Sequence, residues 1–133
     1  MDTFLPDALP VTCDCCTHAI RTPEQGVILW IPSPDPVSPP KLFIVHALGA
    51  HPECQFEPMQ HPGADLVPLW EATGTGGLAF LCECMKSEPH SAPSIAEIIQ
   101  RLFIPAYDRI RYIRATPAPG VFSYGEKAQS PLT

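Results

Sequence analysis

Residues 27–48, VILWIPSPDPVSPPKLFIVHAL, hold the two segments with the clearest strand signal in the chain. The flanking segments VILWI (27–31) and KLFIVHAL (41–48) are rich in β-branched and aromatic residues, which favour strands. The intervening PSPDPVSPP cannot extend a sheet because proline lacks the backbone N–H group that a sheet requires. We therefore expect a β-hairpin with a long, exposed, proline-rich loop at its tip.

Two pairs of metal-binding residue types flank this hairpin. Cys13 and Cys16 form a Cys-x2-Cys pair before it, and His51 and Cys54 form a His-x2-Cys pair after it. Two intervening residues allow one tight turn to direct both side chains at one ion, and zinc takes four thiolate or imidazole ligands in a tetrahedron. Pro52 favours the first position of a helix, which would place His51 and Cys54 one turn apart. The spacing predicts a Zn²⁺ site.

Other residues are alternative ligands. His46 ends the second predicted strand and competes with His51 for the third position, and Cys15 is a further substitute. Cys82, Cys84 and His90 form a possible second cluster, for which the alternative is two cysteines on an inward face.

The segments CDCC (13–16) and HPEC (51–54) resemble the Cys-x2-Cys…His-x2-Cys finger of LIM-like treble-clef zinc modules. The resemblance covers about residues 11–58, under half of the chain. It implies a knuckle, a β-hairpin and a short helix that bears the last two ligands. The segment 17–50 between the two pairs is longer than LIM-like fingers usually have, and the proline-rich loop accounts for it as an insertion.

The six cysteines also allow interpretations without zinc. An iron–sulfur cluster would use Cys13, Cys16 and Cys54 with Cys82 or Cys84. Buried or redox-active thiols and disulfides are further alternatives.

The second half of the chain carries one more predicted hairpin and a helix. Segments 66–72 and 78–85 flank the glycine-rich TGTGG, which suits a tight reversal, and alternation along 78–85 would place Cys82 and Cys84 on the same side of a strand. Ser94 and Glu97 form a capping box for a helix whose apolar face contains Ile95, Ile98, Ile99, Leu102 and Phe103. Pro105 should end that helix. The following PAYDRIRYIRA is expected to restart as a helix that buries Ala106, Ile110 and Ile113, and the alternative for this segment is a strand.

These elements predict a small, single-domain α+β fold with two β-hairpins, a treble-clef-like zinc site and one or two C-terminal helices. The domain would cover residues 1–115, with its metal-binding part at 11–58 and the second hairpin and helix at 64–115. Residues 116–133, rich in proline and glycine, are expected to form a flexible or draped tail. The start of the sequence has acidic residues where a secretory signal has basic ones, so we expect a cytoplasmic, reducing location and no membrane contact.

The net charge of −6 hides a strong asymmetry. Basic residues are concentrated after residue 100, whereas acidic residues dominate before it. A partner would meet the strip formed by Arg101, Arg109, Arg111 and Arg114 with Tyr107 and Tyr112. The alternative is that this strip pairs with the acidic half of the chain itself.

A filled zinc tetrahedron has no open position for chemistry, so the sequence favours a protein-interaction adaptor or regulatory module with a structural metal. The first alternative is a nucleic-acid-binding regulator that uses the Arg101–Arg114 strip, although the negative net charge opposes it. The second is a small zinc hydrolase or deaminase-like enzyme, because His51-Pro52-Glu53 matches one half of the deaminase motif. No feature of the sequence requires catalysis.

Overall fold

Two antiparallel sheets and three α-helices make up the part of the chain that the computed structural model describes, residues 9–35, 37–57, 60–61 and 63–114, with the backbone alone for 109 and 112–114. The strands are β1 (Val11–Thr12), β2 (Ala19–Ile20), β3 (Gly26–Ile31), β4 (Lys41–His46) and β5 (Asp65–Pro68). The helices are α1 (Gly74–Ser87), α2 (Ala92–Phe103) and α3 (Tyr107–Arg114), and the 3-10 turns are η1 (Pro23–Gln25), η3 (Leu69–Ala72) and η4 (Pro89–Ser91).

The larger sheet has the strand order β4-β3-β5, and the predicted hairpin of β3 and β4 is confirmed. Its register pairs Ile28 with Ile44 and Gly26 with His46, and the proline-rich residues between the strands form an exposed loop in which Val37 is 81% accessible. Ile28 and Leu29 point to opposite faces of β3, yet both are fully buried. Both faces of the central strand are therefore covered.

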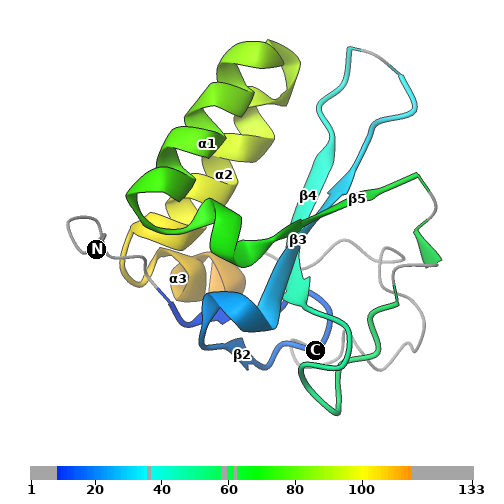
Figure 1. Ribbon diagram of the computed structural model, residues 1–133, viewed down its shortest axis with the longest axis vertical. Coiled ribbons are helices and arrows are strands. Elements are labelled where there is room, and N and C mark those ends of the chain that lie inside the picture. The colour runs from blue at the N-terminus through cyan, green and yellow to red at the C-terminus, as the bar shows by residue number, and fades with distance from the viewer. Residues whose placement is uncertain (1–8, 36, 58–59, 62, 115–133) are drawn as a thin grey trace.

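The helices α1 and α2 lie side by side, and α2 packs against β4 (Figure 1). The predicted apolar face of α2 is confirmed, with Ile95, Ile98 and Leu102 fully buried. The helix ends at Phe103, because Ile104 precedes a proline and is extended. The predicted capping box is wrong, since α2 begins at Ala92 and the Ser94 hydroxyl donates to the Pro40 carbonyl at 2.6 Å.

The predicted second hairpin is also wrong. Residues 65–68 do form a strand, β5, but it pairs with β3, and residues 78–85 lie within helix α1. The segment LAFLCECM is rich in good helix formers, and only Leu81 among its side chains is fully buried. On a helix Cys82 and Cys84 do not share a face, and Cys82 is exposed whereas Cys84 is half-buried.

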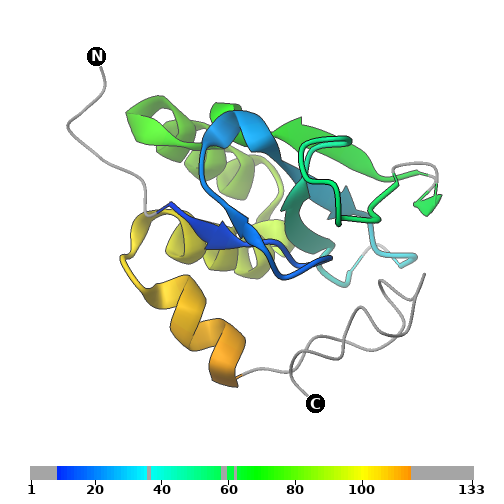
Figure 2. The same ribbon diagram turned by 90° about the horizontal axis from the view of Figure 1, so that it is seen from below.

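The helix after Pro105 is confirmed as α3, but its predicted buried face is not. Ile110 is 50% exposed and Ala106 is exposed, whereas Asp108 is buried. The side chain of Ile113 and the predicted tail at 116–133 lie outside the described residues. The short β1–β2 hairpin lies near the end of the larger sheet that is lowest in Figure 1, and α3 lies beside β1 (Figure 2).

Candidate metal centre

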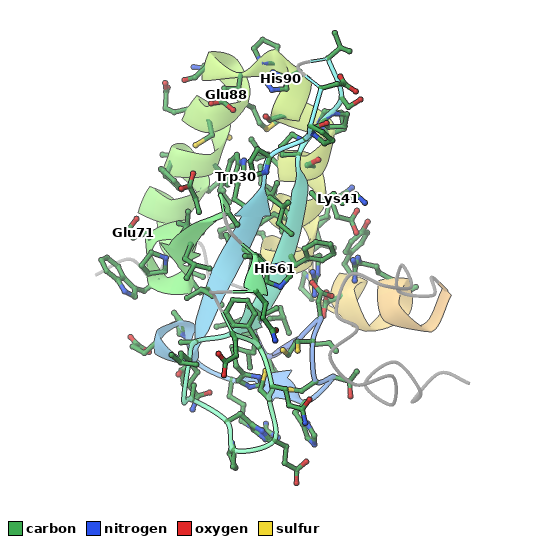
Figure 3. All side chains as sticks on the ribbon, turned by 90° about the vertical axis from the view of Figure 1, so that its right-hand side faces the viewer. Trp30, Lys41, His61, Glu71, Glu88 and His90 are labelled. Carbon is green, nitrogen blue, oxygen red and sulfur yellow. The ribbon has the colours of Figure 1, made fainter. Side chains whose placement is uncertain are left out.

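Four metal-binding side chains converge beside the β1–β2 hairpin. Cys13 and Cys16 come from the turn between β1 and β2, His46 ends β4, and Cys54 follows in the next loop. One donor atom from each residue lies within 4.8 Å of all the others. Sulfur atoms gather at the lower end of the sheet in Figure 3. Three thiols and one imidazole form a donor set that suits Zn²⁺.

The turn at residues 13–17 has the geometry of a metal knuckle. The Thr17 amide donates to the Cys13 carbonyl at 2.9 Å, and Thr17 has a positive φ of 69° that reverses the chain. The amides of Cys15 and Cys16 point at the Cys13 sulfur, at 3.4 and 3.5 Å. Such N–H donors favour a thiolate over a thiol.

His46 is held with one ring nitrogen toward the cysteines. It is 2% exposed, its Nε2 lies 3.2 Å from the Ala19 carbonyl oxygen, and its Nδ1 lies 3.3 Å from the Cys16 sulfur. Because the carbonyl only accepts, Nε2 carries the proton and Nδ1 presents its lone pair to the thiols. A histidine bound to metal is oriented by its second nitrogen in the same way.

His51 lies at the rim of the cluster and is not among the four converging residues. It belongs to a neighbouring group with Cys16 and His18, whose donor atoms also lie within 4.8 Å of one another. The predicted helix at Pro52 is wrong, because residues 51–54 make a single turn closed by the bond from the Cys54 amide to the His51 carbonyl, at 3.1 Å. Spacing along the chain favoured His51, whereas the fold brings His46 into the cluster through the end of β4.

The thiols of the cluster share their charge unevenly. Hydrogen bonds from Cys13, Cys15 and Cys16 lower the pKa of Cys54. Burial and the hydrogen bond with Cys16 raise the pKa of Cys13. For Cys16 the bond with Cys13 lowers the pKa, but the bond with Cys54 and burial outweigh it and raise the pKa to about 11. Hydrogen bonding within the cluster thus favours ionisation of Cys54 over that of Cys13 and Cys16.

Cys15, the predicted substitute ligand, is buried and lies outside the group of four. The hydrogen bond with Cys54 raises the pKa of the Cys15 thiol, and burial raises it further. The side chain therefore supports the Cys54 thiolate from the core side.

A buried ionic network fixes the knuckle to the helices. Arg101 of α2 is 1% exposed, and its guanidinium contacts the carboxylates of Asp14 and Asp108 and the Thr12 carbonyl. Burial alone would lower the pKa of Arg101, but the two carboxylates outweigh this effect and raise it. Asp14 also accepts the Ile44 amide at 2.8 Å. Pairing of Arg101 with acidic groups of the same chain was an open alternative from the sequence, whereas Asp14 and Asp108 as its partners had no signal in the local sequence.

The members of the predicted partner strip whose side chains the structure describes, Arg101, Tyr107 and Arg111, contact groups of the same chain. Arg101 is buried, Arg111 pairs with Glu97 and Asp14, and the Tyr107 hydroxyl donates to Glu97 at 2.9 Å. The alternative, pairing with acidic groups of the same chain, is confirmed for Arg101 and Arg111. The side chains of Arg109, Tyr112 and Arg114 lie outside the described residues.

The possible second cluster is not assembled. Cys82, Cys84 and His90 are all described, and their donor atoms do not form a metal-ligand group with one another or with Cys13. Cys82 and Cys84 lie on α1, and His90 lies in η4. The second cluster and the four-cysteine arrangement therefore have no support from the positions of these residues.

No protein-family model matches the sequence, and no curated protein or solved structure is significantly similar to it. None of the helices in the described part of the chain is long and apolar enough to cross a membrane. The function has to be argued from the geometry of the described residues.

Proposed function

We propose that this chain is a zinc-binding interaction module in which the metal is structural. The observation that carries the proposal is the convergence of Cys13, Cys16, His46 and Cys54 from three separate segments onto one point. Four donors of this kind would complete a tetrahedron around a zinc ion, which would then have no position left for water or substrate. The metal would serve the fold and would not act as a Lewis acid.

The position of the cluster supports this structural role. β1 and β2 have two residues each, and a hairpin of that size is not stable in isolation. A bound ion would join this hairpin to the end of β4 through His46 and to the next loop through Cys54. The neighbouring Asp14 and Arg101 pair then connects the same hairpin to α2.

The opposite end of the molecule supports the interaction role. An open cavity of about 310 Å³ lies there between β3 and α1. Its lining is apolar at Trp30, Phe80 and Cys84 and polar at Glu83, Ser87 and Glu88. Trp30, Glu88 and His90 all lie at this upper end in Figure 3. A protein segment with an apolar side chain beside a basic one has the complementary chemistry.

Elemental analysis of the full chain, purified without chelator, tests the metal. We expect zinc in the native protein and in the Cys82→Ser control, whose thiol is exposed on α1. Cys54→Ser and His46→Ala should lose the tightly bound ion. Native protein without thiophilic metal, which also takes up none on reconstitution, would refute the structural site.

Selection from a displayed peptide library on the zinc-loaded chain tests the interaction surface. Enriched peptides should combine an apolar residue with Lys or Arg, and Glu83→Lys and Glu88→Lys should weaken their binding several-fold. Glu71→Lys is the matched control, because Glu71 is an exposed acid that does not line the cavity. Enriched peptides that bind all three variants equally, or no enrichment at all, would refute this surface.

A further inference from the structure

The rim of the metal centre contains a second group of donors that the structural site does not use. Cys16, His18 and His51 each offer one ligand atom, and these atoms lie within 4.8 Å of one another. Cys16 belongs to both groups, whereas His18 is exposed and His51 is half-buried. The two groups therefore meet at a single sulfur atom.

Contacts around His18 orient it as a ligand. Its Nε2 lies 3.2 Å from the Glu53 carboxylate oxygen Oε1, so Nε2 holds the proton and Nδ1 keeps its lone pair. A carboxylate behind an imidazole is a common outer partner of a metal-bound histidine. Glu53 thus acts on His18 as a positioning residue.

The two imidazoles are also held together before any ion arrives. The rings of His18 and His51 stack with centroids 4.5 Å apart at 26°, and the Glu53 amide donates to His51 Nδ1 at 3.1 Å. His51 further contacts His46 of the first site, with ring centroids 4.9 Å apart. His51 can bind an ion through Nδ1 once that nitrogen exchanges the Glu53 amide for the metal, so the rings are already close but this one hydrogen bond has to break.

From this arrangement we propose a second, exchangeable site for a divalent ion of the zinc class, formed by Cys16, His18 and His51. The proposal rests on the proposed function, because the Cys16 thiolate would bridge the second ion to the structural one. Thiolate and imidazole are the donors that such ions prefer. Because His18 is exposed, the fourth position would be open to solvent, as it is in zinc sites with three protein ligands.

Electrostatics favours a second cation at this position. Three thiolates at the first site exceed the charge of one divalent ion by one unit, so the filled structural site remains anionic. Glu53 adds a carboxylate at the rim. Because these groups are close and partly exposed, the attraction between the second ion and the first site should weaken as salt is added.

Cobalt titration of the metal-free full chain tests the proposal. We expect two equivalents to bind, the first with thiolate charge-transfer absorption and the second more weakly. His18→Ala and His51→Ala should leave the first equivalent intact and weaken the second by at least about tenfold. His90→Ala, a histidine at the other end of the molecule, should bind both equivalents normally.

Electron paramagnetic resonance tests the shared sulfur. A bridging Cys16 thiolate couples the spins of two cobalt ions, so the signal per cobalt should fall when the second equivalent binds. Signals that simply add would refute the bridge. Binding of one equivalent only, or a second equivalent that persists in both histidine variants, would refute the second site while leaving the structural site standing. Absence of the first, thiolate-bound equivalent would refute the proposed function itself.

Glu53→Gln tests whether Glu53 positions His18, separately from any effect of Glu53 on folding. The amide oxygen still accepts a hydrogen bond from His18, but the negative charge is gone. We expect the second equivalent to bind more weakly than in the native chain and more tightly than in His18→Ala, with the first equivalent unchanged. Equal affinity in Glu53→Gln and the native chain would show that Glu53 does not position His18.

Discussion

The Arg101 guanidinium donates to the Asp14 carboxylate at 2.7 Å, and this contact joins the middle of the metal knuckle to the end of α2. Both side chains are largely shielded from water, with 0% of Arg101 and 10% of Asp14 exposed. Asp14 lies directly between two cysteines of the cluster region, so the position of α2 and the shape of the knuckle depend on each other.

Loss of this arginine should be costly. Arg101→Met leaves the buried Asp108 carboxylate without its cation and leaves Asp14 with only the 3.7 Å contact to Arg111, so we expect the free energy of unfolding to fall by about 3–5 kcal/mol. Arg111→Met is the control, because Arg111 is 25% exposed, and it should cost about 1 kcal/mol or less. Urea unfolding of the metal-loaded proteins measures both. Equal effects of the two substitutions would contradict the role given to Arg101.

Two neighbouring glycines of α1 should respond in opposite directions to alanine. A Cβ at Gly77 would lie 2.1 Å from the Ala72 carbonyl carbon, so Gly77→Ala should destabilise the protein by about 1–3 kcal/mol. A Cβ at Gly76 has nothing within 4 Å, so Gly76→Ala should stabilise the protein by about 0.5–1 kcal/mol through its higher helix propensity. Thermal unfolding of the pair checks the approach of α1 to η3. A stable Gly77→Ala variant would contradict it.

Metal binding should release protons. The pKa of Cys13 is raised and that of Cys16 is about 11, so both thiols are protonated near neutral pH in the metal-free protein, whereas Cys54, whose pKa is lowered, is ionised. Binding of zinc to all three should displace about two protons per ion, and the affinity should rise with pH across neutrality because the pKa values of Cys13 and Cys16 are both raised. Calorimetry in buffers of different ionisation enthalpy counts these protons. An affinity that stays constant between about pH 6 and about pH 8, on either side of neutrality, would contradict this ionisation pattern.

Removal of the ion should lower the free energy of unfolding. An ion present at about 1,000 times its dissociation constant adds about 4 kcal/mol to the free energy of unfolding, so a chelator should lower the unfolding temperature of the native chain. Cys54→Ser should unfold at the lower temperature with or without chelator, and Cys82→Ser should behave like the native chain. An unfolding temperature that is insensitive to chelator in a zinc-containing native protein would argue against a structural role.

Local sequence preference was sufficient for some elements. β3 and β4 are uninterrupted runs of strand-forming residues, and α2 has a regular apolar face that ends before Pro105. The segment 78–85 was misassigned because its apolar residues fit both a period of 2 and a helical period. The close contact of Gly77 with Ala72, which suits a helix packed on η3, has no signature in local sequence.

In the candidate site, too, some features follow from the local sequence and others depend on tertiary structure. The pair Cys13 and Cys16 follows from a single turn, so its spacing predicted their proximity. The choice between His46 and His51 depends on where β4 ends relative to the knuckle, which is a tertiary property. Burial of Arg101 likewise depends on Asp14 and Asp108, which come from distant parts of the chain.

The residues Cys16 and His46 lie 30 positions apart and enclose β3, the proline-rich loop and β4. An ion bound to both acts as a cross-link, and the chain entropy lost in closing such a loop grows only with the logarithm of its length. Doubling the enclosed segment would cost about 0.6 kcal/mol. Changes in the length of the exposed tip should therefore have little effect on the affinity for metal, and the tip is free to vary in sequence and size while the centre that closes the loop is kept.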